Sequence, residues 1–123
     1  MIGRVAGLHA LVGVAFRFQD QPDLPGLSIE CVVDTGFTGF LTLPPAAVAR
    51  LELPFFSTIA ADLADGSTVY VAVHIATIDW DGEERDVEVL ATGARPLLGT
   101  LLLDGHELSV RFTEGGRVSI DAL

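Results

Sequence analysis

The most informative segment of the chain is residues 31–41, which read CVVDTGFTGFL. Its apolar start places Asp34 directly after a strand that enters the core, where a carboxylate is costly unless it is paired or hydrogen-bonded. Thr35 adds a hydroxyl beside it, and Gly36 lets the backbone turn sharply. Asp-Thr-Gly is also a common turn sequence, because Asp caps turns and Gly accepts positive φ. The tripeptide alone leaves both interpretations open, an ordinary turn and a site that carries chemistry.

Strand patterns dominate on both sides of this segment. They occur at residues 12–18, 27–33, 41–43, 55–63, 68–79, 85–90, 106–112 and 117–120. Residues 44–51, PPAAVARL, predict a helix, since proline suits the first turn and alanine favours the helix. Residues 100–103 predict one further helical turn, and Asp65-Gly66 and Asp81-Gly82 predict tight hairpins. Many short strands with frequent turns predict an all-β barrel or sandwich.

Composition sets limits on the function. The chain has 123 residues, which suits a single domain spanning residues 1–123. Its net charge is −10, which argues against nucleic acid and against an anionic membrane surface as partners. Residues 1–18 are interrupted by glycines and by Arg17, so we interpret them as mature sequence and expect a cytoplasmic protein. Cys31 is the only cysteine, which excludes an internal disulfide and a thiolate zinc site.

The remaining polar residues give weaker signals. The three histidines, His9, His74 and His106, lack the spacing of metal ligands, and we predict no metal site. Cys31 falls in a predicted buried strand and is interpreted as a small hydrophobic residue. A run of acidic residues around the second hairpin lacks the pattern of a calcium loop and is interpreted as a solvated turn. Its members are Asp79, Asp81, Glu83, Glu84 and Asp86.

The segment around Asp34 resembles the catalytic loop of the retropepsin-like (clan AA) aspartic proteases, in particular their small prokaryotic members. The similarity runs in order along nearly the whole chain, through VDTGFTG (33–39), LTLP (41–44), LADGS (63–67) and PLLGT (96–100). The apolar pair before Gly99 is similar to the second signature of that family. The resemblance implies a retropepsin-like acid protease barrel with one short helix, working as a two-fold homodimer.

The same resemblance implies an aspartic endopeptidase, a hydrolase that cleaves peptide or protein substrates without a cofactor. Each subunit would supply one Asp34, and the two carboxylates would meet on the symmetry axis. Two carboxylates that lie so near each other cannot both be ionised, so they share a proton. A water held between them would attack the scissile carbonyl.

The resemblance also implies roles for other residues. Thr35, Gly36 and Thr38 would support the catalytic loop, with the Thr35 hydroxyl reaching across the two-fold axis. Residues Asp65, Gly66 and Ser67 would form the tip of a flap that closes over substrate. Gly99 would be a structural glycine behind the catalytic loop.

One residue departs from the family pattern. Small residues usually follow Asp-Thr-Gly, whereas this chain has Phe37 there. Phe37 cannot bond the outer oxygen of Asp34, so either Thr38 makes that bond or the bond is absent, and the ring could narrow the cleft. Two rival interpretations stay open: a non-catalytic dimeric peptide-binding module, and a domain in which the Asp34 pair only holds the dimer together.

Overall fold

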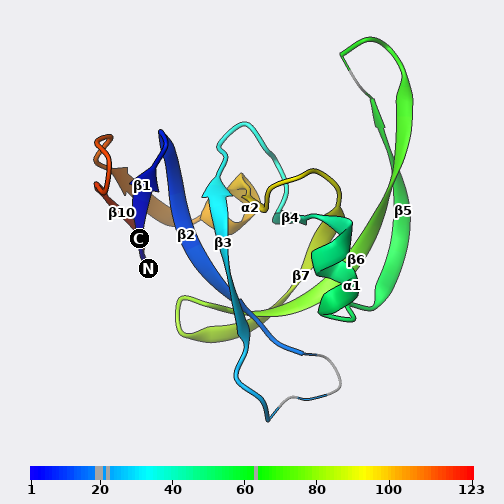
Figure 1. Ribbon diagram of the computed structural model, residues 1–123, viewed down its shortest axis with the longest axis horizontal. Helices are drawn as coiled ribbons and strands as arrows, with labels where there is room; N and C mark the ends of the chain where they lie inside the picture. Colours follow the sequence, from blue (N-terminus) through cyan, green and yellow to red (C-terminus); the bar gives the residue numbers. More distant parts are fainter. Residues whose placement is uncertain (19–20, 22, 63) are drawn as a thin grey trace.

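The computed structural model describes residues 1–18, 21, 23–62 and 64–123. In this part of the chain, one ten-stranded sheet and two short helices account for the regular structure (Figure 1). The elements are β1 (Ile2–Ala6), β2 (His9–Phe16), β3 (Leu27–Val33), β4 (Leu41–Leu43), α1 (Pro45–Arg50), β5 (Phe55–Asp62), β6 (Thr68–Trp80), β7 (Glu83–Ala91), β8 (Leu97–Leu98), α2 (Thr100–Leu103), β9 (His106–Val110) and β10 (Arg117–Ala122). The protein is therefore mostly β-sheet, as its sequence patterns predict.

The strand order shows which strands are neighbours of β3 and β4, the two strands on either side of the Asp34 segment in the sequence. It runs β5-β6-β7-β4-β8-β3-β2-β1-β10-β9, and β6 also pairs with the end of β2. Most neighbours are antiparallel, but β3 lies parallel to β8 and β4 lies parallel to β7. β8, which comes from the second half of the chain, therefore lies between β3 and β4 and pairs with both.

The core lies directly beneath this connection. Leu41 of β4 pairs with Leu98 of β8, and neither side chain is exposed. Burial of such apolar side chains supplies most of the stability of a domain this small. The other large side chains that are fully buried include Phe16, Leu43, Leu51, Ile78, Leu102 and Ile120.

Most predicted elements are confirmed, some with shifted ends, and the strands β1 and β8 were not predicted. β3 and β4 occupy the predicted residues, and β5 runs from Phe55 to Asp62, while Leu63, the last residue predicted for it, lies outside the described residues. β1 was not predicted, since Gly3 interrupts its pattern. A Cβ atom at Gly3 would fall on the carbonyl of Leu11 in β2, so the close approach of these strands requires glycine there. The helical turn predicted at 100–103 is a second short helix, α2.

The two Asp-Gly hairpins form as predicted. Gly66 has a φ of +85°, and Asp81 and Gly82 have φ values of 53° and 83°. These left-handed conformations match the right-handed twist of the paired strands on either side. Neither helix in the described part of the chain has the length and apolar character needed to cross a membrane.

Candidate active site

Asp34 lies at the end of β3 and is half-buried. Its backbone N–H donates to the carbonyl of Leu98 at 2.9 Å, which fixes the residue against β8. Its carboxylate oxygen Oδ1 accepts the backbone N–H of Gly36, also at 2.9 Å. The carboxylate is therefore oriented by its own loop, and the loop is anchored by a strand from the other half of the chain.

The segment after β8 holds the rest of this loop. The N–H groups of Gly99, Thr100 and Leu101 donate to the carbonyls of Phe40, Phe37 and Gly39 at 2.9, 2.9 and 3.1 Å. The loop from Asp34 to Phe40 thus wraps around the start of α2. Backbone bonds between segments so far apart in sequence make the position of Asp34 depend on the whole fold.

Gly99 lies directly behind the loop. A Cβ atom there would meet the carbonyl oxygen of Gly39, and it would lie 2.7 Å from the carbonyl oxygen and 2.6 Å from ring carbon Cδ2 of Phe37. Its φ of −99° is open to any residue, so glycine is needed for space. Even one methyl group would push the loop away from β8.

The ring of Phe37 folds back onto its own loop. A Cβ atom at Gly39 would touch ring carbons Cζ and Cε1 of Phe37, the latter at 2.6 Å, and would meet no other group within 3.3 Å. The ring therefore fills the space that the absent side chains of Gly39 and Gly99 leave. The sequence signals for this packing were the two glycines, whose partner could not be identified before the fold was known.

The two threonines of the loop are exposed. Among the side-chain hydrogen bonds of the described residues, none involves Thr35 or Thr38, so in the single chain Thr38 does not bond the carboxylate of Asp34. The role of Thr35 across a two-fold axis stays a prediction.

Thr42 is a supporting residue that sequence reasoning missed. It is only 4% exposed, and its hydroxyl accepts the N–H of Leu97 at 3.1 Å. This bond ties β4 to β8 directly beneath the loop. A polar residue in the apolar triplet LTL was the available signal, because a buried hydroxyl needs a partner.

The tip of the β5–β6 hairpin carries Asp65, Gly66 and Ser67, all exposed. Figure 1 shows this hairpin rising away from the rest of the molecule. Asp65 Oδ1 accepts two hydrogen bonds from Ser67, from the hydroxyl at 2.6 Å and from the N–H at 2.9 Å. The first of these is the main reason that the pKa of Asp65 is lowered. Among the described residues, no hydrogen bond joins this tip to the loop of Asp34.

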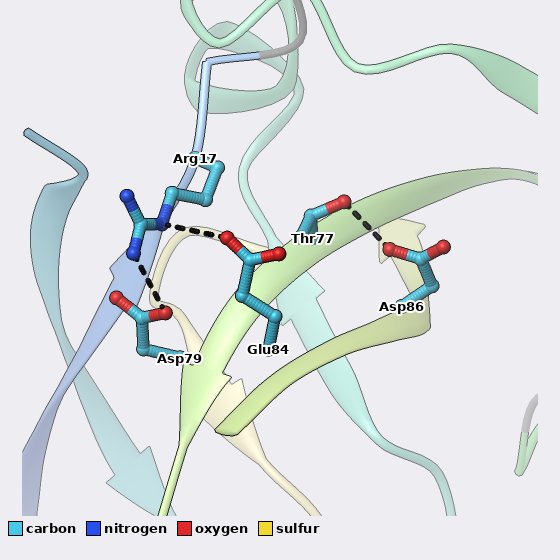
Figure 2. Close-up of polar contacts among 5 residues, drawn as sticks. All are labelled: Arg17, Thr77, Asp79, Glu84 and Asp86. Atoms are coloured by element: carbon cyan, nitrogen blue, oxygen red, sulfur yellow. Dashed lines mark hydrogen bonds and ion pairs between the residues drawn. The ribbon is translucent and has the colours of Figure 1, made fainter. Parts of the chain in front are cut away.

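Three acidic residues of the β6–β7 hairpin, Asp79, Glu84 and Asp86, have partners within the chain, as Figure 2 shows. Arg17 pairs with Asp79 at 3.0 Å and, more loosely, with Glu84 at 3.7 Å, and the hydroxyl of Thr77 donates to Asp86 at 2.6 Å. The two contacts of Arg17 fasten the end of β2 to the hairpin, and the bond of Thr77 joins β6 to β7. Over the described ranges, no group of three or more His, Cys, Asp or Glu side chains is placed to hold a metal ion.

Two solved aspartic proteases have similar folds. EIAV protease, in complex with the inhibitor HBY-793, superposes with a TM-score of 0.62 at 17% identity, over 81% of this chain and 91% of its own. A retropepsin-like aspartic protease from Rickettsia conorii superposes with a TM-score of 0.61 at 15% identity, over 100% of this chain and 91% of its own. At these identities the likeness establishes a retropepsin-like fold.

Comparison of sequences adds no further relative. No protein-family model matches the chain, and no curated protein matches it. The functional argument therefore rests on the geometry of the loop and on the fold.

Proposed function

We propose that this protein is an aspartic endopeptidase, in which a water is activated between the Asp34 carboxylates of two subunits. The observation that carries this proposal is the anchoring of Asp34, whose backbone bonds to Leu98 while its carboxylate accepts the N–H of Gly36. A turn that served only to connect β3 to β4 would not need such long-range fixation. The similar folds of two aspartic proteases support the same conclusion.

The chemistry needs two carboxylates and one water. One ionised carboxylate takes a proton from the water as its oxygen attacks the scissile carbonyl carbon. The protonated partner donates a hydrogen bond to the oxyanion that develops. When the C–N bond breaks, the leaving amine takes a proton from the pair, and the dyad returns to its starting state. A single chain supplies only one Asp34, so the proposal requires a homodimer.

In this proposal the other residues of the site hold the loops, the water and the substrate in place. The exposed hydroxyl of Thr35 would brace the loop of the partner subunit, and the backbone of Gly36 would lie beside the water. The hairpin tip at Asp65, Gly66 and Ser67 would close over an extended substrate, which would bind as an added strand. Gly99 would keep the loop in place from behind.

Digestion of an unstructured peptide library tests the proposal. The wild-type protein should cleave peptides, and a statine-type inhibitor should block cleavage. Asp34→Asn keeps a side-chain oxygen that can accept the N–H of Gly36, so the loop should stay folded. We expect this variant to lose activity by about 10²–10⁴-fold, the usual contribution of a general acid–base group, and to keep its oligomeric state.

The same digestion can also refute the proposal. If the folded wild-type protein cleaves nothing between about pH 3 and pH 8, where carboxylates titrate, the endopeptidase proposal fails. If it still binds peptides, the non-catalytic dimeric peptide-binding module replaces it.

A further inference from the structure

A groove lies between α1 and β6, where the β5–β6 hairpin joins the rest of the molecule (Figure 1). Its volume is about 470 Å³, which is within the usual range of a small-molecule site. Val48 of α1 and Leu53 form part of the lining and are 4% and 6% exposed, so this part of the groove is continuous with the core. None of residues 34–40 lines it, and the groove is therefore separate from the loop of Asp34.

The segment that follows α1 ties one end of the groove to β6. The imidazole nitrogen Nδ1 of His74 bonds to the carbonyl oxygen of Leu53 at 2.9 Å, and the N–H of Ile75 donates to the carbonyl oxygen of Pro54 at 3.0 Å. The ring of Phe55 lies edge-on to the ring of His74, with 5.7 Å between the ring centroids. Because these contacts already hold both sides, a ligand would meet a preformed site and would lose little affinity to ordering the chain.

Two hydrogen-bond acceptors belong to this largely apolar lining, one from His74 and one from Glu52. A carbonyl oxygen can only accept, so the neutral His74 ring carries its proton on Nδ1, and Nε2 is left as an acceptor. The carboxylate of Glu52 is exposed and forms no ion pair with any described residue, including Arg50 two residues earlier. The ligand that suits these two groups donates hydrogen bonds and carries a positive charge.

The aromatic side chain of Tyr70 forms another part of the groove and is 78% exposed. A ring so open to water can be covered by the apolar body of a ligand, and its face attracts a nearby ammonium group. The net charge of the chain is −10, which attracts cations and repels anions at longer range. Local and overall charge therefore favour the same class of ligand.

The secondary structure around the groove favours a small ligand over a polypeptide. β6 is paired on both sides, with β5 and with β7, so it offers no free backbone edge to an added strand. α1 has six residues, about 9 Å of helix, which is too short to hold a docked helix along its side. Contact with a ligand is thus made by side chains, which suits a compact organic molecule.

We propose that the groove between α1 and β6 binds a small organic amine. Its ammonium group would donate to the carboxylate of Glu52 and to Nε2 of His74, and its apolar body would cover Tyr70. This inference goes beyond the proposed endopeptidase activity and does not depend on it.

Three indoles with one ring system and different charges test the site. Tryptamine carries an ammonium group, tryptophol a hydroxyl group and indole-3-acetate a carboxylate. In an NMR titration, tryptamine should shift the methyl signals of Ala49 and Ala72, which both line the groove, and should saturate with a Kd of about 1 mM or lower. Tryptophol should bind about fivefold more weakly, since it lacks the ion pair with Glu52. Indole-3-acetate should bind more weakly still.

Three variants locate the interaction. Glu52→Gln removes the charge and keeps the shape, so the Kd of tryptamine should rise about fivefold while that of tryptophol stays unchanged. Ala49→Trp, at an exposed position on α1, would place a ring in the groove and should weaken the binding of both ligands. Glu107→Gln, on β9 at the opposite end of the strand order from β5, controls for net charge and should leave every Kd unchanged. Circular dichroism would check that each variant is folded.

Each contrary result overturns the proposal. If tryptamine gives no saturable shift up to about 10 mM, or if the shifts lie away from the groove, no amine site exists there. If Glu52→Gln and Glu107→Gln have equal effects, the overall charge attracts the ligand and the Glu52 carboxylate does not. If tryptophol binds as tightly as tryptamine, the groove does not select amines. Binding is measured without substrate, so a protein that cleaves no peptide could still bind tryptamine, and the two proposals fail separately.

Discussion

Two aspartates of this chain form the same local turn in different surroundings. Asp34 Oδ1 accepts the N–H of Gly36, and Asp65 Oδ1 accepts the N–H of Ser67, each at 2.9 Å and each two residues ahead. Asp34 is half-buried and its loop is bonded to β8 and α2, whereas Asp65 is exposed and its turn makes only its own bonds. The local chemistry is nearly identical, and the tertiary contacts are not.

The comparison shows that a local turn can orient a carboxylate without fixing its position in the molecule. A two-residue turn of this kind orients a carboxylate relative to its own backbone, and many surface loops use it. The backbone bonds that the loop makes with Leu98, Gly99, Thr100 and Leu101 place Asp34 relative to the rest of the molecule. A reaction between two groups requires that each be held at a fixed position in the molecule. A segment that opens and closes instead needs few bonds to the rest of the molecule.

The largest expected effect comes from adding a methyl group behind the fixed loop. Gly99→Ala would drive a Cβ atom into the backbone of Phe37 and Gly39, and the free energy of unfolding should fall by about 3 kcal/mol or more. Gly66→Ala, at the hairpin tip, meets nothing within 4 Å and suffers only from its positive φ, so about 1 kcal/mol is expected. Urea denaturation measures both. Equal effects at the two glycines would refute the contrast between the loops.

A double-mutant cycle would test the packing of Phe37. Gly39→Ala alone should cost about 2 kcal/mol of stability, because its Cβ atom would collide with the ring of Phe37. In a Phe37→Ala background the same change should cost less than about 0.5 kcal/mol, since the three atoms nearest to that Cβ atom all belong to the ring of Phe37. An additive cycle would show that the ring does not occupy this space.

Cys31, in the strand β3 that leads into the loop of Asp34, should make the stability of the protein depend on pH. Burial raises the pKa of the Cys31 thiol from 9.0 to about 12. Above pH 9 the unfolded chain loses this proton while the folded chain keeps it, so stability falls as the pH rises toward 12, by about 1.4 kcal/mol per pH unit. Denaturation at pH 8 and pH 10.5 should show a loss of about 2 kcal/mol that Cys31→Ala lacks.

Thiol labelling checks the same contrast between the two regions. A disulfide reagent at pH 8 should react slowly with Cys31 of the folded protein, because the thiol is buried and protonated. A thiol introduced at the hairpin tip by Ser67→Cys should react at the rate of a free cysteine. Equal rates at the two positions would contradict the burial of β3.

The smallest expected effect lies at the hairpin tip. The hydroxyl of Ser67 is the main cause of the lowered pKa of Asp65, so Ser67→Ala should raise that pKa toward its ordinary value. Because Asp65 is exposed, the thermal midpoint should stay unchanged. Carboxyl NMR titration of both proteins would measure the shift, and an unchanged pKa would rule out the hydrogen bond from Ser67.

Local patterns were sufficient to predict most strands and the hairpins. The pattern of apolar residues predicted where β3 and β4 begin and end, and Asp81-Gly82 predicted the turn between β6 and β7. Each of these signals lies within a few residues of sequence. The parallel pairing of β3 with β8 was not predictable in this way, because it joins segments that share no local signal. The packing of Phe37 against Gly39 and Gly99 and the bond of Thr42 to Leu97 depend on that pairing, so they became visible only with the fold.

The pairing of Val32 with Leu97 also has a consequence for the order of folding. A contact between residues so distant in sequence carries a large loop-closure entropy and is expected to form slowly. During synthesis the N-terminal half would leave the ribosome with Asp34 in an unfinished loop, and only emergence of the C-terminal third would complete it. A nascent chain therefore cannot complete the loop of Asp34 before the C-terminal third of the protein has been synthesised.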